Sequence, residues 1–291
     1  MTRDWKKVNQ KYVREGYLYL SFDFLDTWNK ELAKLNNNKE GARYKYPESL
    51  IRFCSTLKVV FHLGYRQEQG TLESLQKWVQ IPDVISYSQI QRRITKLGLD
   101  LVKSLVKQED AQIIAVDSTG IKLYNSGEWI REKHKKKKPF LKLHIAVNVK
   151  LKQAVAIEVT EDSVGDSTLG LKLIDRARKI KRVAKGLFDG AYDTYEIWNG
   201  LNARGIKPLI RLRKNAVINY KESETRSQAV KCYKGIEKEW VKATGFGQRW
   251  QDESWISSYK RRFGEHCFSI NPENVVHEIL MKVCLLNKLI V

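Results

Sequence analysis

The chain has few cysteines, and none of them are spaced as metal ligands usually are. The four that occur among its 291 residues are Cys54, Cys232, Cys267 and Cys284, with no CxxC pair. This scatter argues against a zinc ribbon and against a disulfide framework. It predicts a protein of a reducing, intracellular compartment.

Long hydrophobic runs are also missing. No stretch approaches the roughly 20 consecutive apolar residues that a membrane-spanning helix needs. The N-terminal segment MTRDWKKVNQKY is charged and lacks the apolar core of a secretory signal. We therefore expect no membrane partner and a cytoplasmic location.

Acidic residues are too few to balance the basic ones. Against 53 Lys and Arg there are 33 Asp and Glu, which leaves a formal charge of +20, and the sequence pI is about 9.7. Eight Trp, thirteen Tyr and 42% hydrophobic residues place this charge on a folded body and not on a disordered tail. Nucleic acid is the polyanionic partner that this balance favours.

Residues 1–110 have the periodicity of helices. Apolar residues recur at three- and four-residue spacing in LDTWNKELAKL, SLIRFCSTLKVVFHLG, TLESLQKWVQI and SYSQIQRRITKLGLDLVKSLV. We expect breaks at Gly64, Gly70 and Pro82. Two short helical patterns between Thr71 and Leu97, with Ser86 or Ser88 as an N-cap, are compatible with a DNA-binding helix-turn-helix. Its exposed candidates are Gln89, Arg92 and Arg93, although a plain helical pair in a bundle fits the pattern equally well.

The period changes at residue 111. AQIIAVDST, LKLHIAVNV and QAVAIEVTE predict three neighbouring antiparallel strands, and RVAKGLFDG and KPLIRL predict two more between helices. This order predicts an α/β fold with an RNase H-like mixed five-stranded sheet flanked by helices over residues 111–291. The polar segment 214–228 is interpreted as a loop.

Two of the predicted strands run directly into carboxylates, Asp117 and Asp189. If the strands are neighbours, the two carboxylates lie close together, and a cation is the simplest way to keep both ionised. Oxygen ligands without a Cys or His cluster indicate Mg²⁺ or Mn²⁺. An Asp after a strand is common, so neither residue alone establishes a site.

The candidate for a third carboxylate is Glu253, in GFGQRWQDESWISSYKRRFGE. Helical spacing places Arg249, Glu253 and Lys260 on one stripe. The apolar side chains expected to pack this helix onto the sheet are Trp250, Trp255, Tyr259 and Phe263. A solvated helix face is the alternative interpretation of the stripe.

Basic residues between the first two strands provide weaker DNA-binding candidates. The segment 131–142 contains Lys135, Lys136, Lys137, Lys138 and Lys142, and sequence-independent phosphate contact is one function for it. A solvated hairpin tip is the other. His144 is a further candidate or a core histidine, and Trp129 either stacks on a base or packs internally.

In these residues the chain resembles the DDE transposases of bacterial and archaeal insertion sequences, in the branch usually numbered five within the larger group numbered four. The matching stretches are VDSTGIKLYNSGEW, LKLHIAV, FDGAYDT and KPLIRLRKNA. The group's third signature, Tyr, Arg, Glu and Lys, aligns with Phe246, Arg249, Glu253 and Lys260, and Phe246 departs from it. The resemblance covers most of residues 45–291.

The resemblance implies metal-dependent cleavage and strand transfer of double-stranded DNA at terminal inverted repeats and target DNA. Asp117 would bridge two metal ions, Mg²⁺ or Mn²⁺, with Asp189 and Glu253 on one ion each, while Arg249 and Lys260 hold phosphates. A homodimer assembled on DNA is expected because two transposon ends must meet. Residues 1–110 would bind the DNA ends.

Two other functions remain open from the sequence. A metal-dependent nuclease on the same fold would cleave DNA without strand transfer, and its sequence would look much the same. A non-catalytic DNA-binding regulator built on the N-terminal helices would have no need of the three carboxylates.

Overall fold

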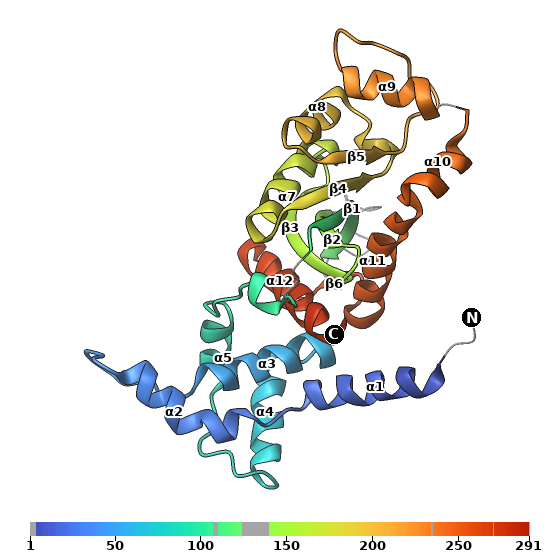
Figure 1. The fold of residues 1–291 in the computed structure, drawn as a ribbon. Helices are drawn as coiled ribbons and strands as arrows, with labels where there is room; N and C mark the ends of the chain where they lie inside the picture. The colour runs from blue at the N-terminus through green and yellow to red at the C-terminus, as the bar shows by residue number, and fades with distance from the viewer. Residues whose placement is uncertain (1–3, 107–109, 124–139, 234, 270, 291) are drawn as a thin grey trace, which may run out of the picture. The chain divides into compact units, whose positions relative to one another are not determined.

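The structure is a computed structural model that describes residues 4–106, 110–123, 140–233, 235–269 and 271–290. By internal contacts the chain divides into a helical unit, Met1–Leu99 with His277–Leu285, and a sheet unit, Asp100–Val276 with Leu286–Val291. We describe each unit by itself (Figure 1). The functional division of the chain at residue 110 stays a prediction. No helix within the described ranges is both long and apolar enough to cross a membrane.

The helical unit is built from five helices and the middle of a sixth. Its core is formed by apolar side chains that recur at helical spacing, among them the fully buried Leu50, Leu57 and Ile90. Phe24 and Phe53 pack with ring centroids 5.1 Å apart. The helices are α1 (Trp5–Tyr19), α2 (Phe24–Asn36), α3 (Glu48–Phe61), α4 (Tyr65–Gln76), α5 (Tyr87–Ile94) and part of α12 (Pro272–Ile290).

The helical periodicity of this region is confirmed, with three differences of detail. Gly70 does not break a helix but lies inside α4, where nothing crowds it. The last predicted helix is shorter than expected, because α5 ends at Ile94 and only a 3-10 turn, η1 (Val102–Ser104), follows. Ser86 is the N-cap residue of α5, but its side chain makes no capping hydrogen bond.

The proposed helix-turn-helix corresponds to α4 and α5, which contact each other. The Tyr87 N–H donates to Gln69 Oε1 at 2.8 Å and ties the start of α5 to α4. Arg92 is exposed on α5. Arg93 instead donates to the Tyr46 carbonyl and lies over the ring of Tyr44, so the structure gives it an internal role.

A buried carboxylate, Glu68, lies inside the helical unit. Its side chain is fully buried on α4, and neither oxygen accepts a hydrogen bond from a residue that the structure describes. Burial raises the pKa of Glu68 to about 8, and the Lys58 ammonium opposes the rise only in part. The folded protein therefore holds Glu68 protonated at pH values where the unfolded chain ionises it.

We expect Glu68→Gln to stabilise the protein at neutral pH. Between the unfolded pKa near 4.5 and the folded value near 8, unfolding releases a proton, so the wild-type free energy of unfolding falls as the pH rises. A tenfold change in proton affinity corresponds to about 1.4 kcal/mol, which gives a loss of several kcal/mol over this range. Urea denaturation of both proteins from pH 4 to 9 measures it. Parallel stability curves for the two proteins would contradict the prediction.

The sheet unit has a mixed sheet with strand order β3-β2-β1-β4-β5. Strands β1 (Gln112–Leu123), β2 (Phe140–Asn148) and β3 (Gln153–Glu161) are antiparallel neighbours. Strands β4 (Val183–Phe188) and β5 (Lys207–Ile210) run parallel to β1. This is the RNase H-like arrangement that the sequence predicts, and a short sixth strand, β6 (His266–Cys267), adds a parallel pairing to the end of β1.

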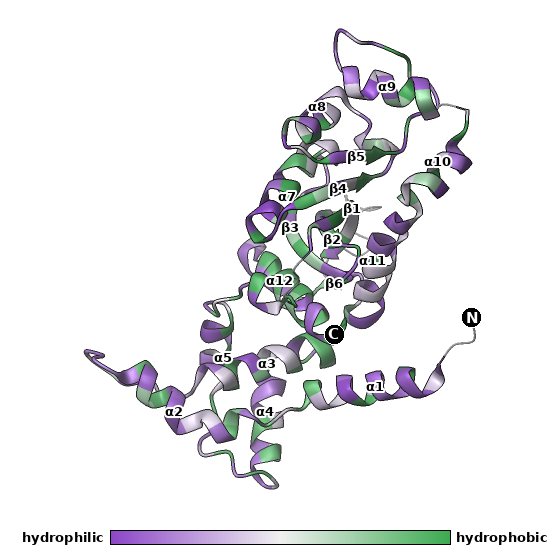
Figure 2. Cartoon of the chain, in the orientation of Figure 1, coloured by the Kyte–Doolittle hydropathy of each residue, from purple (hydrophilic) through white to green (hydrophobic). Residues whose placement is uncertain are grey.

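Helices cover both faces of this sheet. Ile114 and Val116 of β1 pack in one cluster with α7 (Ser167–Ile180) and α8 (Tyr195–Ala203). Between them in the sequence, Ala115 packs in a second cluster with Trp240 and Phe246. Because side chains alternate along a strand, these clusters lie on opposite faces. Figure 2 shows the hydrophobic residues gathered along β4 and β5 between these layers. The second cluster involves α10 (Glu237–Thr244) and η3 (Phe246–Arg249).

Two predictions for the C-terminal third are wrong in part. The segment 214–228 is not entirely loop, because α9 (Glu224–Tyr233) begins within it. On α11 (Trp250–Phe263), Trp255, Tyr259 and Phe263 are buried as expected, but Trp250 is 53% exposed. Trp250 stands at the first position of the helix.

Candidate active site

Two carboxylates stand at the same edge of the sheet. Strands β1 and β4 are parallel neighbours in a register that pairs Val116 with Phe188. Asp117 follows Val116 and Asp189 follows Phe188, so the two carboxylates lie side by side where β4 ends. Asp189 leaves the strand and caps the 3-10 turn η2 (Gly190–Tyr192) by accepting the Ala191 N–H at 2.8 Å. Asp189 thus follows the end of its strand as predicted, whereas the prediction is wrong for Asp117, which lies within β1 because that strand continues to Leu123.

Helix α11 brings further charged groups to Asp117. The helix contacts β1 and β2, and Arg249 stands at its N-cap. The Arg249 guanidinium bonds Glu253 through Nη2, and its Nη1 lies 3.7 Å from Asp117 Oδ2. Arg249 therefore contacts both Asp117 and Glu253, and its pairing with Glu253 is the one that the helical spacing predicts.

Negative charge exceeds positive charge in this cluster. Burial raises the pKa of Asp117 to about 6; the negative charges of Asp189 and Glu253 add to the rise, and the Ser118 N–H and Arg249 oppose it. Burial tends to lower the pKa of Arg249, but the neighbouring carboxylates outweigh it and raise the value. One guanidinium does not balance the acidic groups that surround it.

A fourth acidic residue, Asp252, belongs to the same cluster. It is fully buried on α11, and its Oδ2 lies 3.6 Å from Arg249 Nη1. Burial raises the pKa of Asp252 to about 7, with the charge of Asp117 as the next cause. The hydroxyl of Tyr192 is also buried, without a hydrogen bond from any described residue, and burial, followed by the neighbouring carboxylates, raises its pKa.

A hard divalent cation fits the chemistry of these donors. Within the part of the chain that the structure describes, no three acidic, His or Cys side chains stand together as a finished metal site. Arg249 lies among the carboxylates and supplies the positive charge there. The buried Asp252 oxygen without a hydrogen bond and the raised pKa of Asp117 both mark a place with too little positive charge. Asp117, Asp189 and Glu253 are the side chains that could hold such an ion.

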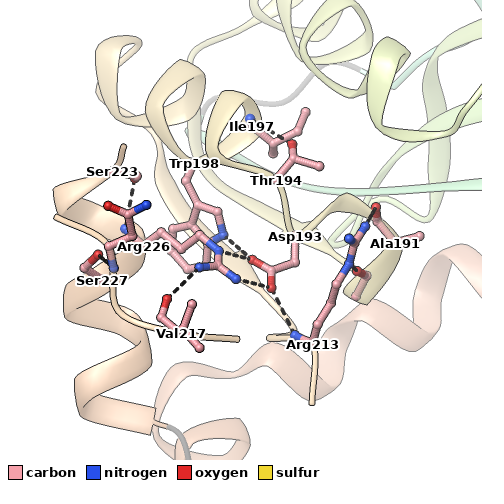
Figure 3. A network of polar contacts seen from close by, with 12 residues as sticks. Ala191, Asp193, Thr194, Ile197, Trp198, Arg213, Val217, Ser223, Arg226 and Ser227 are labelled. Atoms are coloured by element: carbon pink, nitrogen blue, oxygen red, sulfur yellow. Dashed lines mark hydrogen bonds and ion pairs between the residues drawn. The ribbon is translucent and has the colours of Figure 1, made fainter. Parts of the chain in front are cut away.

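A buried ion pair anchors the segment that follows Asp189 (Figure 3). Asp193 accepts from Arg226 Nε at 2.7 Å and Nη2 at 2.9 Å, from Trp198 Nε1 at 2.9 Å and from the Arg213 N–H at 3.0 Å. Burial opposes ionisation of Asp193, but these bonds, led by Arg226, hold its pKa below the usual value. The network ties the η2 turn to α8, α9 and the end of β5, and so fixes the segment that begins with Asp189.

A second polar cluster lies on the opposite side of β1. Ser118, the next residue after Asp117, donates to Asp166 Oδ1 at 2.8 Å. Lys142 Nζ lies 3.3 Å from the same oxygen, and His144 Nδ1 lies 3.7 Å from it. His144 is fully buried and shares a hydrogen bond with Thr160 Oγ1 at 2.9 Å. Among the described residues, Lys142 and His144 thus lie beside Asp166. Asp166 is itself near the Tyr192 hydroxyl, whose pKa it raises together with Asp117. Contact of Lys142 and His144 with DNA stays a prediction.

The remaining candidate residues are placed as follows. Lys260 is partly exposed near the end of α11 and pairs with Glu265 at 3.6 Å. Phe246, at the position where the resembled signature has Tyr, packs on Trp240 with centroids 4.7 Å apart. Candidates outside the described residues are Trp129 and Lys135, Lys136, Lys137 and Lys138.

Comparison with known proteins identifies relatives of both parts of the chain. A family model described as "Transposase DDE domain" matches residues 108–288, and a second model of the same description matches residues 13–126. Among solved structures, a piggyBac transposase synaptic complex with hairpin DNA is similar with a TM-score of 0.44 and 10% identity, covering 96% of this chain and 74% of that one. A pre-cleavage Mos1 transpososome gives a TM-score of 0.26 and 11% identity, over 80% of this chain and 83% of the other. The catalytic core domain of BIV integrase gives 0.27 and 12%, over 60% and 82%.

Proposed function

Because the chain belongs to the family of transposases with a DDE domain, enzymes that cut DNA and join the cut strand elsewhere, we propose that Asp117, Asp189 and Glu253 are its catalytic carboxylates. The observation that carries this proposal is the convergence at β1. Asp117 of β1 and Asp189, which follows the parallel strand β4, lie side by side, and Glu253 of α11 shares the Arg249 guanidinium with Asp117. Neither a helix-packing role nor a regulator's DNA-binding surface requires that arrangement.

The reaction that we infer is a transesterification at phosphorus. In the first step water attacks a phosphodiester, so that one P–O bond forms while the bond to a DNA 3′ oxygen breaks. In the second step the 3′-hydroxyl so released attacks a phosphodiester of the target strand. A new P–O bond forms, and the bond between that phosphorus and the 3′ oxygen of the target strand breaks. Charge develops on the phosphate oxygens in both steps, and preorganised positive groups stabilise it.

Each charged side chain of the site has a role in this scheme. Asp117, on the rigid central strand, would hold the divalent metal ions together with Asp189 and Glu253. Arg249, which shields the carboxylates in this structure, would turn its planar fork to a DNA phosphate once that shielding is no longer needed. Lys260 would leave Glu265 and serve as a point charge on a neighbouring phosphate.

Divalent metal ions complete the proposed chemistry. Transposases of this class depend on them, and the oxygen donors here suit Mg²⁺ or Mn²⁺. When bound, the ions would favour the deprotonated nucleophile and offset charge on the leaving oxygen. The chain's own contribution is the frame, because the Asp193 network fixes the turn that bears Asp189.

The partner that we propose is double-stranded DNA, as terminal inverted repeats and as target. The charge of +20 supports phosphate binding. We infer that the helical unit contacts the ends through α5, where Arg92 is exposed, and that two protomers assemble on DNA to bring both ends together. The nucleoid of a prokaryotic cell is the location that fits such a substrate.

The decisive experiment is a cleavage and strand-transfer assay on labelled DNA that carries the element's own ends. Wild-type protein is compared with Asp189→Ala, each with Mg²⁺, with Mn²⁺ and with EDTA. We expect joined product from the wild type with either metal ion and none with EDTA, because the carboxylates alone stabilise no negative charge. Asp189→Ala should bind the ends and yield no product.

The outcomes separate the alternatives. Metal-dependent cleavage without joined product would identify a nuclease on the same fold. Equal activity of wild type and Asp189→Ala would show that the site lies elsewhere, and end binding without any cleavage would point to a DNA-binding regulator.

A further inference from the structure

The residue before Glu253 in the chain is a carboxylate that the proposed mechanism does not use. Asp252 lies on α11 and its side chain is fully buried. One oxygen, Oδ1, accepts the Glu253 N–H at 2.6 Å. The other, Oδ2, is buried and receives no hydrogen bond from a described residue. A carboxylate oxygen in that state costs free energy unless a positive charge meets it.

Oδ2 of Asp252 is directed into the cluster around Asp117. The same guanidinium nitrogen, Arg249 Nη1, lies 3.6 Å from Asp252 Oδ2 and 3.7 Å from Asp117 Oδ2. Both separations are too long for hydrogen bonds. The two oxygens, one from the helix and one from the strand, therefore face one place from two sides, and that place is only loosely filled.

Arg249 is committed more closely to another partner. Its Nη2 bonds Glu253 Oε1 directly, and the Glu253 side chain is 56% exposed, whereas that of Asp252 is fully buried. Buried Asp252 needs a counter-charge more than exposed Glu253 does, yet the Arg249 guanidinium lies farther from Asp252. Holding Arg249 in position does not account for Asp252, since the exposed Glu253 already performs that task.

We propose that Asp252 is a fourth carboxylate of the metal centre and binds, together with Asp117, a divalent cation through Oδ2. The inference rests on the proposed function, because it assumes that Asp117 is a metal ligand. Two hard oxygen donors that converge from a rigid strand and a packed helix suit Mg²⁺ or Mn²⁺. In the structure the Arg249 guanidinium lies close to both oxygens, so it competes with the cation for them.

The test is Mn²⁺ binding by the full-length protein without DNA, measured by calorimetry and by electron paramagnetic resonance of free Mn²⁺. The proteins are wild type, Asp252→Asn, Asp117→Asn and, as a matched control, Asp162→Asn at an exposed position. We expect Asp252→Asn to weaken Mn²⁺ binding at least about tenfold, the scale for a lost metal contact. Asp162→Asn should bind as wild type does.

A second background separates metal binding from an indirect effect through Arg249. Arg249→Gln removes the competing charge and should strengthen Mn²⁺ binding. In that background the added Asp252→Asn should still weaken binding about tenfold. If Asp252 served only to place Arg249, the substitution would change nothing once the guanidinium is gone. Thermal unfolding checks that each variant is folded.

The result also distinguishes this inference from the proposed function. If Asp117→Asn weakens Mn²⁺ binding and Asp252→Asn does not, the fourth carboxylate is refuted and the three-carboxylate site stands. If the wild type binds no Mn²⁺, or Asp117→Asn binds it as well as the wild type, the metal centre itself is refuted, and the inference falls with it.

Discussion

Asp117→Asn should lower the rate of strand transfer on the order of 10³-fold or more, the scale for a group whose interactions are made in the transition state. The substitution keeps the shape of the side chain and removes its charge. The same change should leave the free energy of unfolding equal to that of the wild type or higher. Burial and the neighbouring Asp189 and Glu253 already disfavour the ionised form of Asp117, with its pKa near 6, so that at neutral pH its charge costs stability.

The measurement pairs single-turnover strand transfer with urea denaturation on the same preparations. Asp162→Asn makes the same chemical change at an exposed position of the sheet unit and should alter neither quantity. A variant that loses activity because it unfolds, with a midpoint well below that of the wild type, would remove the support for a catalytic role. Activity within about tenfold of the wild type would contradict the role directly.

Asp193→Ala should destabilise the protein by about 3–5 kcal/mol, because it leaves a buried guanidinium without its counter-charge. Arg226 and Asp193 have side chains that are 8% and 0% exposed, and their bidentate contact is reinforced by Trp198 and the Arg213 N–H. Since this network anchors the turn after β4, the Asp189 carboxylate should also lose its fixed position, and strand transfer should fall even in the folded fraction.

A second Asp–Arg pair provides the matched control. Asp175 also makes a bidentate contact with Arg204, at 2.7 Å for both bonds, but these side chains are 42% and 26% exposed. Asp175→Ala should cost no more than about 1 kcal/mol. Adding Arg226→Met to Asp193→Ala should recover part of the lost stability, because the isolated charge is removed. Equal costs for Asp193→Ala and Asp175→Ala would show that burial of the pair is not what stabilises the turn.

The parts of the site that follow from short-range patterns could be predicted from the sequence. Asp117 and Asp189 each follow an apolar, β-branched run, and such a run is visible without knowing the fold. That β1 continues past Asp117 to Leu123 was not visible. Glu253 and Arg249 follow from helical spacing alone. The RNase H-like sheet follows from the order of strand and helix patterns, since three strands before a helix leave few ways to pair.

The residues that were missed depend on contacts between distant segments. Asp193 was not singled out because its partner, Arg226, lies in a stretch whose polarity predicts a loop. Arg226 instead lies on α9 and pairs with Asp193. One signal could have identified Asp252: it is a charged residue at a buried position of α11. The sequence WQDESW does not reveal which of its residues face the sheet. Asp166, the N-cap residue of α7, meets Ser118 and Lys142 of the sheet only in the folded chain.

The pairing of β6 with β1 joins the segment after α11 to the strand that carries Asp117. Lys122 and Leu123 pair with His266 and Cys267, and the Lys122 N–H donates to the Glu265 carbonyl at 2.8 Å. Helix α11 is thereby held at its far end, as the packing of Phe246 on Trp240 holds the near end. A growing chain that has not reached Cys267 contains Asp117 and Asp189 but lacks the clasp that keeps Glu253 beside them. The proposed set of three carboxylates thus depends on residues 266–267, and a truncation before them would leave Glu253 without this support.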